Sequence, residues 1–180
     1  DNSSNSVTLN INSFVIDTTA PTVSSIYPTD NQSGVSITTD NISVTFSEAM
    51  DNTSVTTNTS NTSCSGSFAL SSDNFSTCVK MSSSPSSSNS NKTFTLDPYD
   101  NLTVSTTYKT RVTTGVKDTA GNTLSSQYET SSGFTTFADL TAPTVSSISP
   151  TDNSTDVSFS TTVAVTFSET MSTSTITTNT

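Results

Sequence analysis

The chain has 180 residues, 29% of them hydrophobic, and carries a net charge of −10 from five basic and fifteen acidic side chains. This charge opposes binding to the phosphates of nucleic acids and to anionic membranes, and the sequence contains no apolar run long enough to span a bilayer. Histidine is absent, and neither a nucleophile motif nor a recognisable pair of catalytic carboxylates occurs. We therefore expect no enzyme, no catalytic residue, no organic cofactor, no nucleic-acid partner and no membrane insertion within this chain.

Serine and threonine dominate the composition, with 79 of the 180 residues. Low hydrophobicity of this kind is also typical of disordered, low-complexity stalks. The apolar residues, however, alternate with polar ones in short runs, and threonine suits a pleated surface. The pattern predicts an ordered all-β protein.

One sequence segment occurs twice in the chain. Thr19–Ile26 returns unchanged as Thr141–Ile148, 122 residues later, and Val44–Glu48 returns as Val165–Glu169. A period of this length is that of a domain, which indicates a tandem array. We predict that residues 1–18 are the terminal strand of a preceding repeat, that 19–140 are a complete repeat, and that 141–180 are the N-terminal part of the next, in a longer natural protein.

Short strands with one buried face are predicted throughout the complete repeat. In chain order they cover residues 22–26, 36–38, 42–46, 67–70, 78–81, 94–96, 108–112 and 134–137. Eight short strands in a repeat of this length favour a two-sheet sandwich. Residues 48–57 are either one short helical turn anchored by Met50 and Val55 or an irregular loop, and the serine-rich stretch 81–91 is predicted to be a long mobile loop.

Cys64 and Cys78 flank a stretch that reads as strand, turn and strand, so they are expected to face each other across a hairpin. A disulfide closing a loop of about 15 residues would stabilise the fold by roughly 3 kcal/mol in the chain-entropy model. The alternative is a pair of unpaired thiols in a cytosolic protein.

Calcium is the one inorganic ligand that the sequence suggests. Oxygen-bearing side chains lie in turns near the expected domain ends, and the candidate ligands are Asp17, Asp118, Asn122 and Asp139. No Asp-x-Asp-x-Asp run is present, and single Asp residues are also ordinary turn formers. The recurring Glu48 and Glu169 are interpreted as structural, accepting backbone N–H bonds at the start of the turn that follows each Val-Thr-Phe strand.

Three segments resemble a known family, the bacterial immunoglobulin-like (Ig-like) domains of surface-layer proteins and large cell-surface or secreted adhesins. They are Asp17–Asp30, Ile42–Met50 and Tyr108–Leu124, in this order along the complete repeat. The resemblance implies Ig-like β-sandwich domains in tandem. It implies no common activity, because the family serves as a spacer and binding scaffold.

The expected function is that of a structural repeat in an extracellular bacterial surface fibre or filament, acting as a semi-rigid spacer. Its partners would be neighbouring Ig-like repeats or identical subunits in a filament. The alternative is an adhesin module that binds glycan or protein through its loops, with 82–91 or the cysteine hairpin as the contact. Tyr27, Tyr99 and Tyr128 are the aromatic candidates for such binding.

Overall fold

The computed structural model describes residues 16–38 and 41–177 of the chain. Residues 1–15, which carry most of the predicted terminal strand of a preceding repeat, lie outside the described residues. The chain forms two compact units with their boundary between Ala138 and Asp139. Among the described residues, no helix is long and apolar enough to cross a bilayer.

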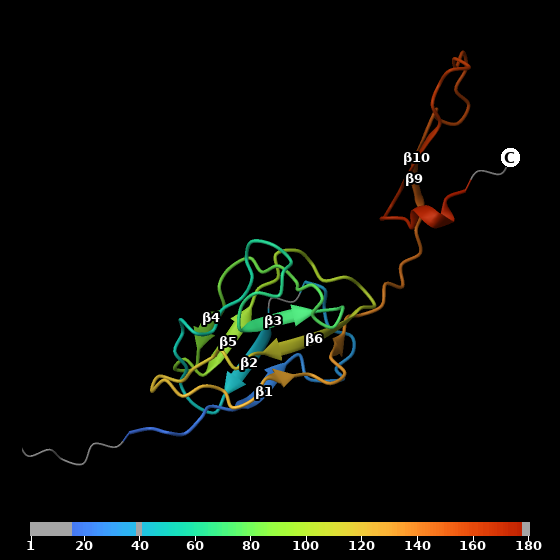
Figure 1. Cartoon of the computed structure of the whole chain (residues 1–180). Coiled ribbons are helices and arrows are strands. Elements are labelled where there is room, and N and C mark those ends of the chain that lie inside the picture. The colour runs from blue at the N-terminus through green and yellow to red at the C-terminus, as the bar shows by residue number, and fades with distance from the viewer. Residues whose placement is uncertain (1–15, 39–40, 178–180) are drawn as a thin grey trace, which may run out of the picture. The chain divides into compact units, whose positions relative to one another are not determined.

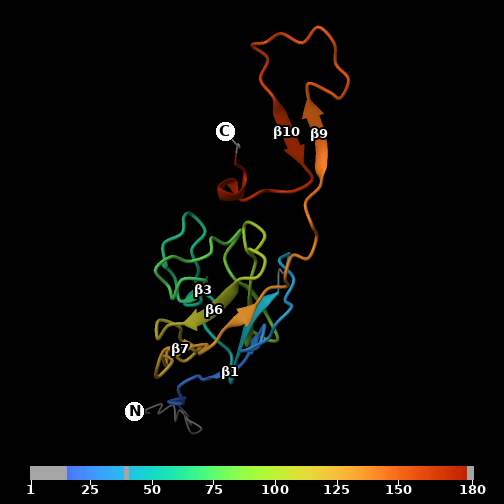
Figure 2. The same cartoon turned by 90° about the vertical axis from the view of Figure 1, so that its right-hand side faces the viewer.

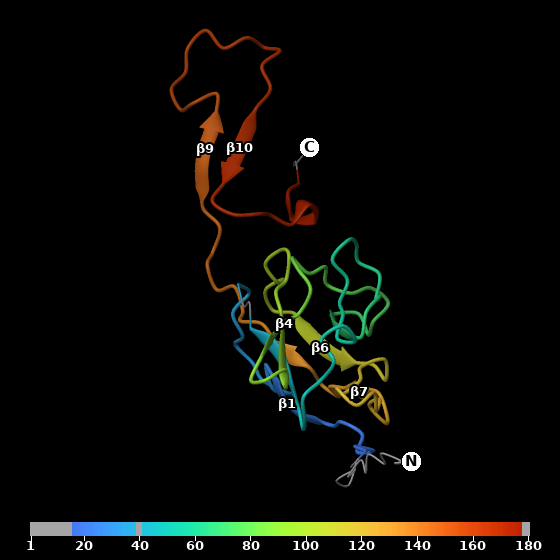
Figure 3. The same ribbon diagram turned by 90° about the vertical axis from the view of Figure 1, so that its left-hand side faces the viewer.

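The first unit contains two antiparallel sheets (Figure 1, Figure 3). Its strands are β1 (Val23–Tyr27), β2 (Ile42–Phe46), β3 (Phe68–Ser71), β4 (Ser86–Ser88), β5 (Thr93–Leu96), β6 (Thr107–Val112), β7 (Tyr128–Glu129) and β8 (Phe134–Thr135). One sheet has the order β1-β2-β5-β4; the other has the order β3-β6-β7, with β8 also paired to β6. This arrangement confirms the predicted all-β sandwich.

One hydrophobic core joins the two sheets. Alternation along β2 buries Ile42, Val44 and Phe46, and β3, β5, β6 and β8 contribute residues to the same cluster. The ring of Phe46 meets that of Phe94 edge to face, with 6.0 Å between centroids. Such edge-to-face contacts add to the stabilisation from buried area, so strands from distant parts of the chain are held together here.

Two predicted strands and one predicted loop are corrected by the structure. Residues 36–38 and 78–81 are not strands. The first range contains no bridge, although the preceding Val35 bridges to Thr136, and the second contains a single bridge from Met81 to Pro98. The serine stretch is not one long loop, because β4 lies within it and pairs with β5. All three residues of β4 are exposed, so this edge strand carries no apolar alternation by which a sequence pattern could reveal it.

The alternative of an irregular loop is correct for residues 48–57, which contain no helix. Met50 and Val55 are nevertheless buried in the core, as their proposed role as anchors requires. In the second unit, the corresponding segment contains a single 3-10 turn, η1 (Thr173–Thr175).

The predicted disulfide between Cys64 and Cys78 is present, and 5.0 Å separates the two Cα atoms. Neither cysteine is free, so the alternative of two unpaired thiols is wrong. The chain before Cys78 is a loop instead of the expected second strand. Arg111 of β6 covers the ring of Phe75 in this loop at 3.6 Å and forms an ion pair with Glu129 of β7 at 3.0 Å. The loop is thus attached to the second sheet.

The second unit contains the hairpin of β9 (Val145–Ser149) and β10 (Ala164–Phe167), visible in Figure 2. Its register and bulge repeat those of β1 and β2. Several apolar side chains are exposed within the described residues of this unit: Leu140, Val145, Ile148, Val157, Phe159, Val163, Val165 and Ile176.

Replacing both cysteines, Cys64→Ser with Cys78→Ser, should lower the free energy of unfolding by roughly 3 kcal/mol, because the 14-residue separation no longer restricts the unfolded chain. Urea unfolding monitored by circular dichroism measures the change. Dithiothreitol should destabilise the wild-type chain by a similar amount and leave the double variant unaffected. An unchanged midpoint in the variant would contradict the prediction.

Candidate functional site

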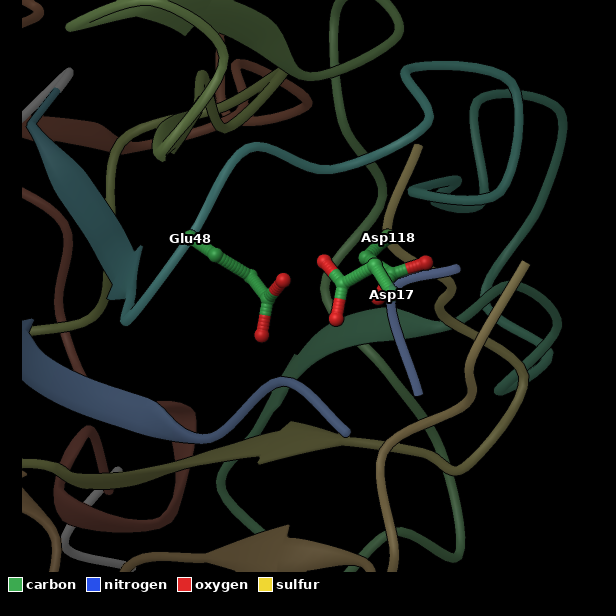
Figure 4. A group of neighbouring side chains, drawn as sticks. All are labelled: Asp17, Glu48 and Asp118. Atoms are coloured by element: carbon green, nitrogen blue, oxygen red, sulfur yellow. The ribbon is translucent and has the colours of Figure 1, made fainter. Parts of the chain in front are cut away.

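Three carboxylates meet at one end of the first unit. Asp17 precedes β1, Glu48 follows β2, and Asp118 lies in the loop between β6 and β7. One oxygen of each lies within 4.8 Å of the others. Figure 4 shows the Glu48 side chain directed toward Asp17 and Asp118. We call these three residues the acidic cluster.

Asp118 is held by the turn that it begins. Its side chain is 1% exposed. One carboxylate oxygen accepts hydrogen bonds from the backbone N–H groups of Ala120 and Asn122, both at 2.8 Å, and the other accepts one from the Asn122 amide at 2.7 Å. The turn docks beside Glu48 through the N–H of Thr119, which donates to the carbonyl of Ala49 at 3.2 Å. A buried carboxylate is thereby fixed beside the end of β2.

Asp17 is positioned by the segment that leads into β1. Its side chain accepts a hydrogen bond from the N–H of Thr19 at 2.9 Å, and its carbonyl accepts one from the Asn122 amide at 3.2 Å. Further on, Thr22 and Ser47 form a reciprocal pair, in which Thr22 N–H donates to Ser47 Oγ at 3.0 Å and Ser47 N–H donates to the Thr22 carbonyl at 2.9 Å. The leading segment is therefore tied to the end of β2.

The pKa values of Glu48 and Asp118 are shifted in opposite directions. Burial raises the pKa of Glu48, and the neighbouring carboxylates of Asp118 and Asp17 raise it further, against a smaller lowering by Lys92. Burial also acts to raise the pKa of Asp118, but hydrogen bonds from Asn122 and from nearby backbone N–H groups outweigh it, so this pKa is lowered. Glu48 therefore takes up a proton more readily than Asp118.

The same construction recurs in the second unit. Thr141 N–H donates to Asp139 at 2.9 Å, as Thr19 does to Asp17, and Thr144 N–H donates to Ser168 Oγ at 2.9 Å, as Thr22 does to Ser47. Burial and the Asp139 carboxylate raise the pKa of Glu169, and its Oε1 atom is buried with no hydrogen-bond partner. Both units thus carry the same pair of carboxylates, Asp17 with Glu48 and Asp139 with Glu169.

The four candidate calcium ligands separate into two places. Asp17, Asp118 and Asn122 lie together, whereas Asp139 lies in the second unit beside Glu169. Sequence reasoning assigned Glu48 to backbone capping and missed it as a member of the cluster. The available signal was that Asp17 and Glu48 both recur in the second copy, as Asp139 and Glu169.

Carboxylate oxygens at this separation form a donor set that suits a hard cation such as calcium, which requires six to eight oxygen ligands. Water and backbone carbonyls would have to supply the remaining ligands. Proton uptake by Glu48 is the other way to relieve repulsion between the three groups. Calcium binding stays a prediction, tested below.

The aromatic candidates for ligand binding do not form one surface feature. Tyr27 lies on β1 and Tyr128 on β7, in different sheets. Tyr99 is exposed, but the ammonium group of Lys80 lies 3.7 Å from its ring centroid. Recognition of a glycan through these residues stays a prediction.

These features define an Ig-like β-sandwich domain followed by a second copy of its first hairpin. The chain belongs to the bacterial Ig-like domain family, which matches residues 17–136 and again residues 139–180. No curated protein matches the chain.

Similar solved structures are fragments of the S-layer protein SbsC. The crystal structure of rSbsC(31-844) is 24% identical, with 71% of this chain and 15% of that chain covered and a TM-score of 0.44. The N-terminal part of SbsC is 23% identical, with 71% and 26% covered and a TM-score of 0.45. This chain therefore spans well under a third of either one.

Opposite pH dependences are expected for two cluster variants. The folded-state pKa of Glu48 is raised, so its charge opposes folding at neutral pH, and this effect disappears as pH falls through that pKa. Glu48→Gln should therefore gain stability relative to wild type at pH 7 in EDTA, and the gain should shrink as pH falls toward about 4.3.

Asp118→Asn should lose about 2 kcal/mol at pH 7, because the backbone N–H groups of Ala120 and Asn122 lose a charged acceptor. The folded-state pKa of Asp118 is lowered, so this loss should disappear only as pH falls through it. Urea unfolding across this pH range measures both variants. Parallel pH profiles for the two would show that the cluster is wrongly described.

Calcium should raise the melting temperature of the wild-type chain, and EDTA should reverse the rise. Binding to the folded state alone contributes about 2.7 kcal/mol at a concentration roughly a hundred times Kd. Glu48→Gln should abolish the rise. The control Glu129→Gln, which removes a carboxylate paired with Arg111 outside the cluster, should retain it. No shift in the wild type would remove calcium from this site.

Proposed function

We propose that this chain is a structural repeat of an extracellular bacterial surface fibre or filament, in which Ig-like domains act as semi-rigid spacers. The observation that carries the proposal is that, in both units, the segment before the first strand is hydrogen-bonded to the residue that follows the second strand. Thr22 with Ser47, and Thr144 with Ser168, form the same pair of hydrogen bonds in both units. A module that is fixed identically at each copy suits serial repetition.

The connection between the two units is short. On one side, Phe137 N–H donates to the Val35 carbonyl at 2.9 Å; on the other, the first backbone anchor is Thr144. Only residues 138–143 lie between these anchors, and Pro143 restricts the backbone further. A linker of this length and composition supports limited freedom between successive domains.

Two chemical features support an extracellular location. A disulfide persists in oxidising compartments and is rare in the cytosol. The net charge of −10 and the abundance of exposed hydroxyl side chains favour solubility. Membership of the bacterial Ig-like family is consistent with such a structural module.

A spacer is preferred to an adhesin because the described loops do not bring together a binding constellation. The three tyrosines are dispersed. The side-chain amide of Asn122, next to the acidic cluster, is already bonded to the Asp17 carbonyl and to Asp118. Catalysis is not part of the proposal, since the chain has no histidine and the cluster contains no nucleophile with a neighbouring base.

Immunogold electron microscopy of native surface material, with an antibody raised against this chain, tests the proposal. Labelling at regular intervals along fibres is the expected result. Label confined to isolated particles, or to the base of fibres, would contradict it. A glycan array probed with the same chain tests the adhesin alternative, and specific binding abolished by Tyr99→Ala would replace the spacer with that function.

A further inference from the structure

The outward face of the sheet β1-β2-β5-β4 carries only hydroxyl side chains at its paired positions. Across the strands the first row is Tyr27, Ser43, Thr95 and Ser86, and the second row is Ser25, Thr45, Thr93 and Ser88. Their neighbours along β2 and β5 point into the core. The Oγ1 atoms of Thr45 and Thr93 lie 3.0 Å apart. We call these eight residues the hydroxyl face.

The other sheet differs in character. The partly exposed residues of β6 include Lys109 and Arg111, and Arg111 forms its ion pair with Glu129 of β7. The hydroxyl face, in contrast, has no charged residue at any of its eight positions, although the chain as a whole has a charge of −10. Its eight side chains therefore supply no charge to attract an ionic ligand.

The second unit repeats part of this face. Thr166 of β10 pairs with Ser147 of β9, as Thr45 pairs with Ser25, and Ala164 pairs with Ser149. Ile148 and Val165 occupy the alternate positions. Three of the four corresponding positions in the second hairpin therefore keep a hydroxyl group, and Ala164 replaces the fourth, Ser43.

We propose that the hydroxyl face is a surface for lateral pairing with the same face of a second copy of this chain. A hydroxyl group both donates and accepts hydrogen bonds, so a hydroxyl surface is complementary to itself under two-fold symmetry. A carboxylate surface only accepts and repels its own copy. In a strongly acidic protein, two copies can bring an uncharged face together without burying like charges.

The size of the face sets the strength of this pairing. Four strands of three to five residues, spaced about 4.8 Å apart, give an area of roughly 270 Å². Stable interfaces bury about 800 Å² on each partner, so one domain would pair weakly. In an array, successive weak contacts add through effective concentration. The biological use of the pairing rests on the proposed function, but the contact itself can be tested on the single chain.

A neutral polysaccharide is the main competing occupant. Flat sugar-binding surfaces use aromatic rings as platforms, and the hydroxyl face offers a single ring, Tyr27, at one corner. The charge and hydrogen-bonding character of the face therefore favour a second copy.

The test is NMR of the labelled 180-residue chain from micromolar to millimolar concentration, in salt that screens the net charge. The amide signals of Ser43, Thr45, Thr93 and Thr95 should shift together. Thr45→Glu with Thr93→Glu should abolish these shifts. The matched control is Thr107→Glu with Thr135→Glu, which alters the corresponding threonine pair of β6 and β8 (2.9 Å between Oγ1 atoms) and should retain them.

Ser25→Glu with Ser88→Glu provides a second disruptive variant at exposed positions, in case the threonine variant unfolds.

Absence of concentration-dependent shifts in the wild type would overturn the proposal, as would equal loss of the shifts in the disruptive and control variants. Shifts confined to Ile148 and Val165 would assign association to the exposed apolar hairpin instead. Shifts of the hydroxyl face on adding soluble neutral glucan to dilute protein, without self-association, would make the occupant a glycan. Each of these results leaves the fibre proposal standing.

Discussion

The alternation of side chains along β2 is the constraint on which the rest of the structure depends. Ile42, Val44 and Phe46 are almost fully buried between the sheets, and the intervening Ser43 and Thr45 lie on the opposite face. A shift of one residue in register would exchange the two sets. Because the strand is fixed by its buried face, its end is fixed too. The leading segment and the acidic cluster are both built at this end, through Ser47 and Glu48.

A chain this poor in apolar residues folds because many of those residues are concentrated in one buried core. The buried cluster draws on most strands of the first unit and on Met50 and Val55 from the loop after β2. The polar majority satisfies the backbone through short side-chain bonds, as in the turn capped by Asp118. The abundant hydroxyl groups are therefore no obstacle to order, since they either cap loops or cover the outer surfaces of the sheets.

Hydrophobic alternation in the sequence predicted the strands that have one buried face. Sequence reasoning located β2 at its observed bounds, placed most other strands to within a residue or two, and paired Cys64 with Cys78. It missed β4, because an exposed edge strand of serines has no buried face and its pairing with β5 is set by tertiary contact. It also separated Glu48 from Asp118, since nothing local in the chain indicates that the loop after β6 returns to the end of β2. The recurrence of Asp17 and Glu48 in the second copy was a sequence signal for the pairing of these two residues, but it carried no information on Asp118.

The disulfide has a further consequence for the spacer role proposed above. When the domain unfolds under force, its extended length depends on the number of residues that can be stretched between its ends. The disulfide between Cys64 and Cys78 excludes the 14-residue loop that it closes from this length. At about 3.4 Å per residue, the opened domain reaches roughly 45 Å less than it otherwise would. The cysteine loop thus limits how far this domain can be extended when it unfolds under force.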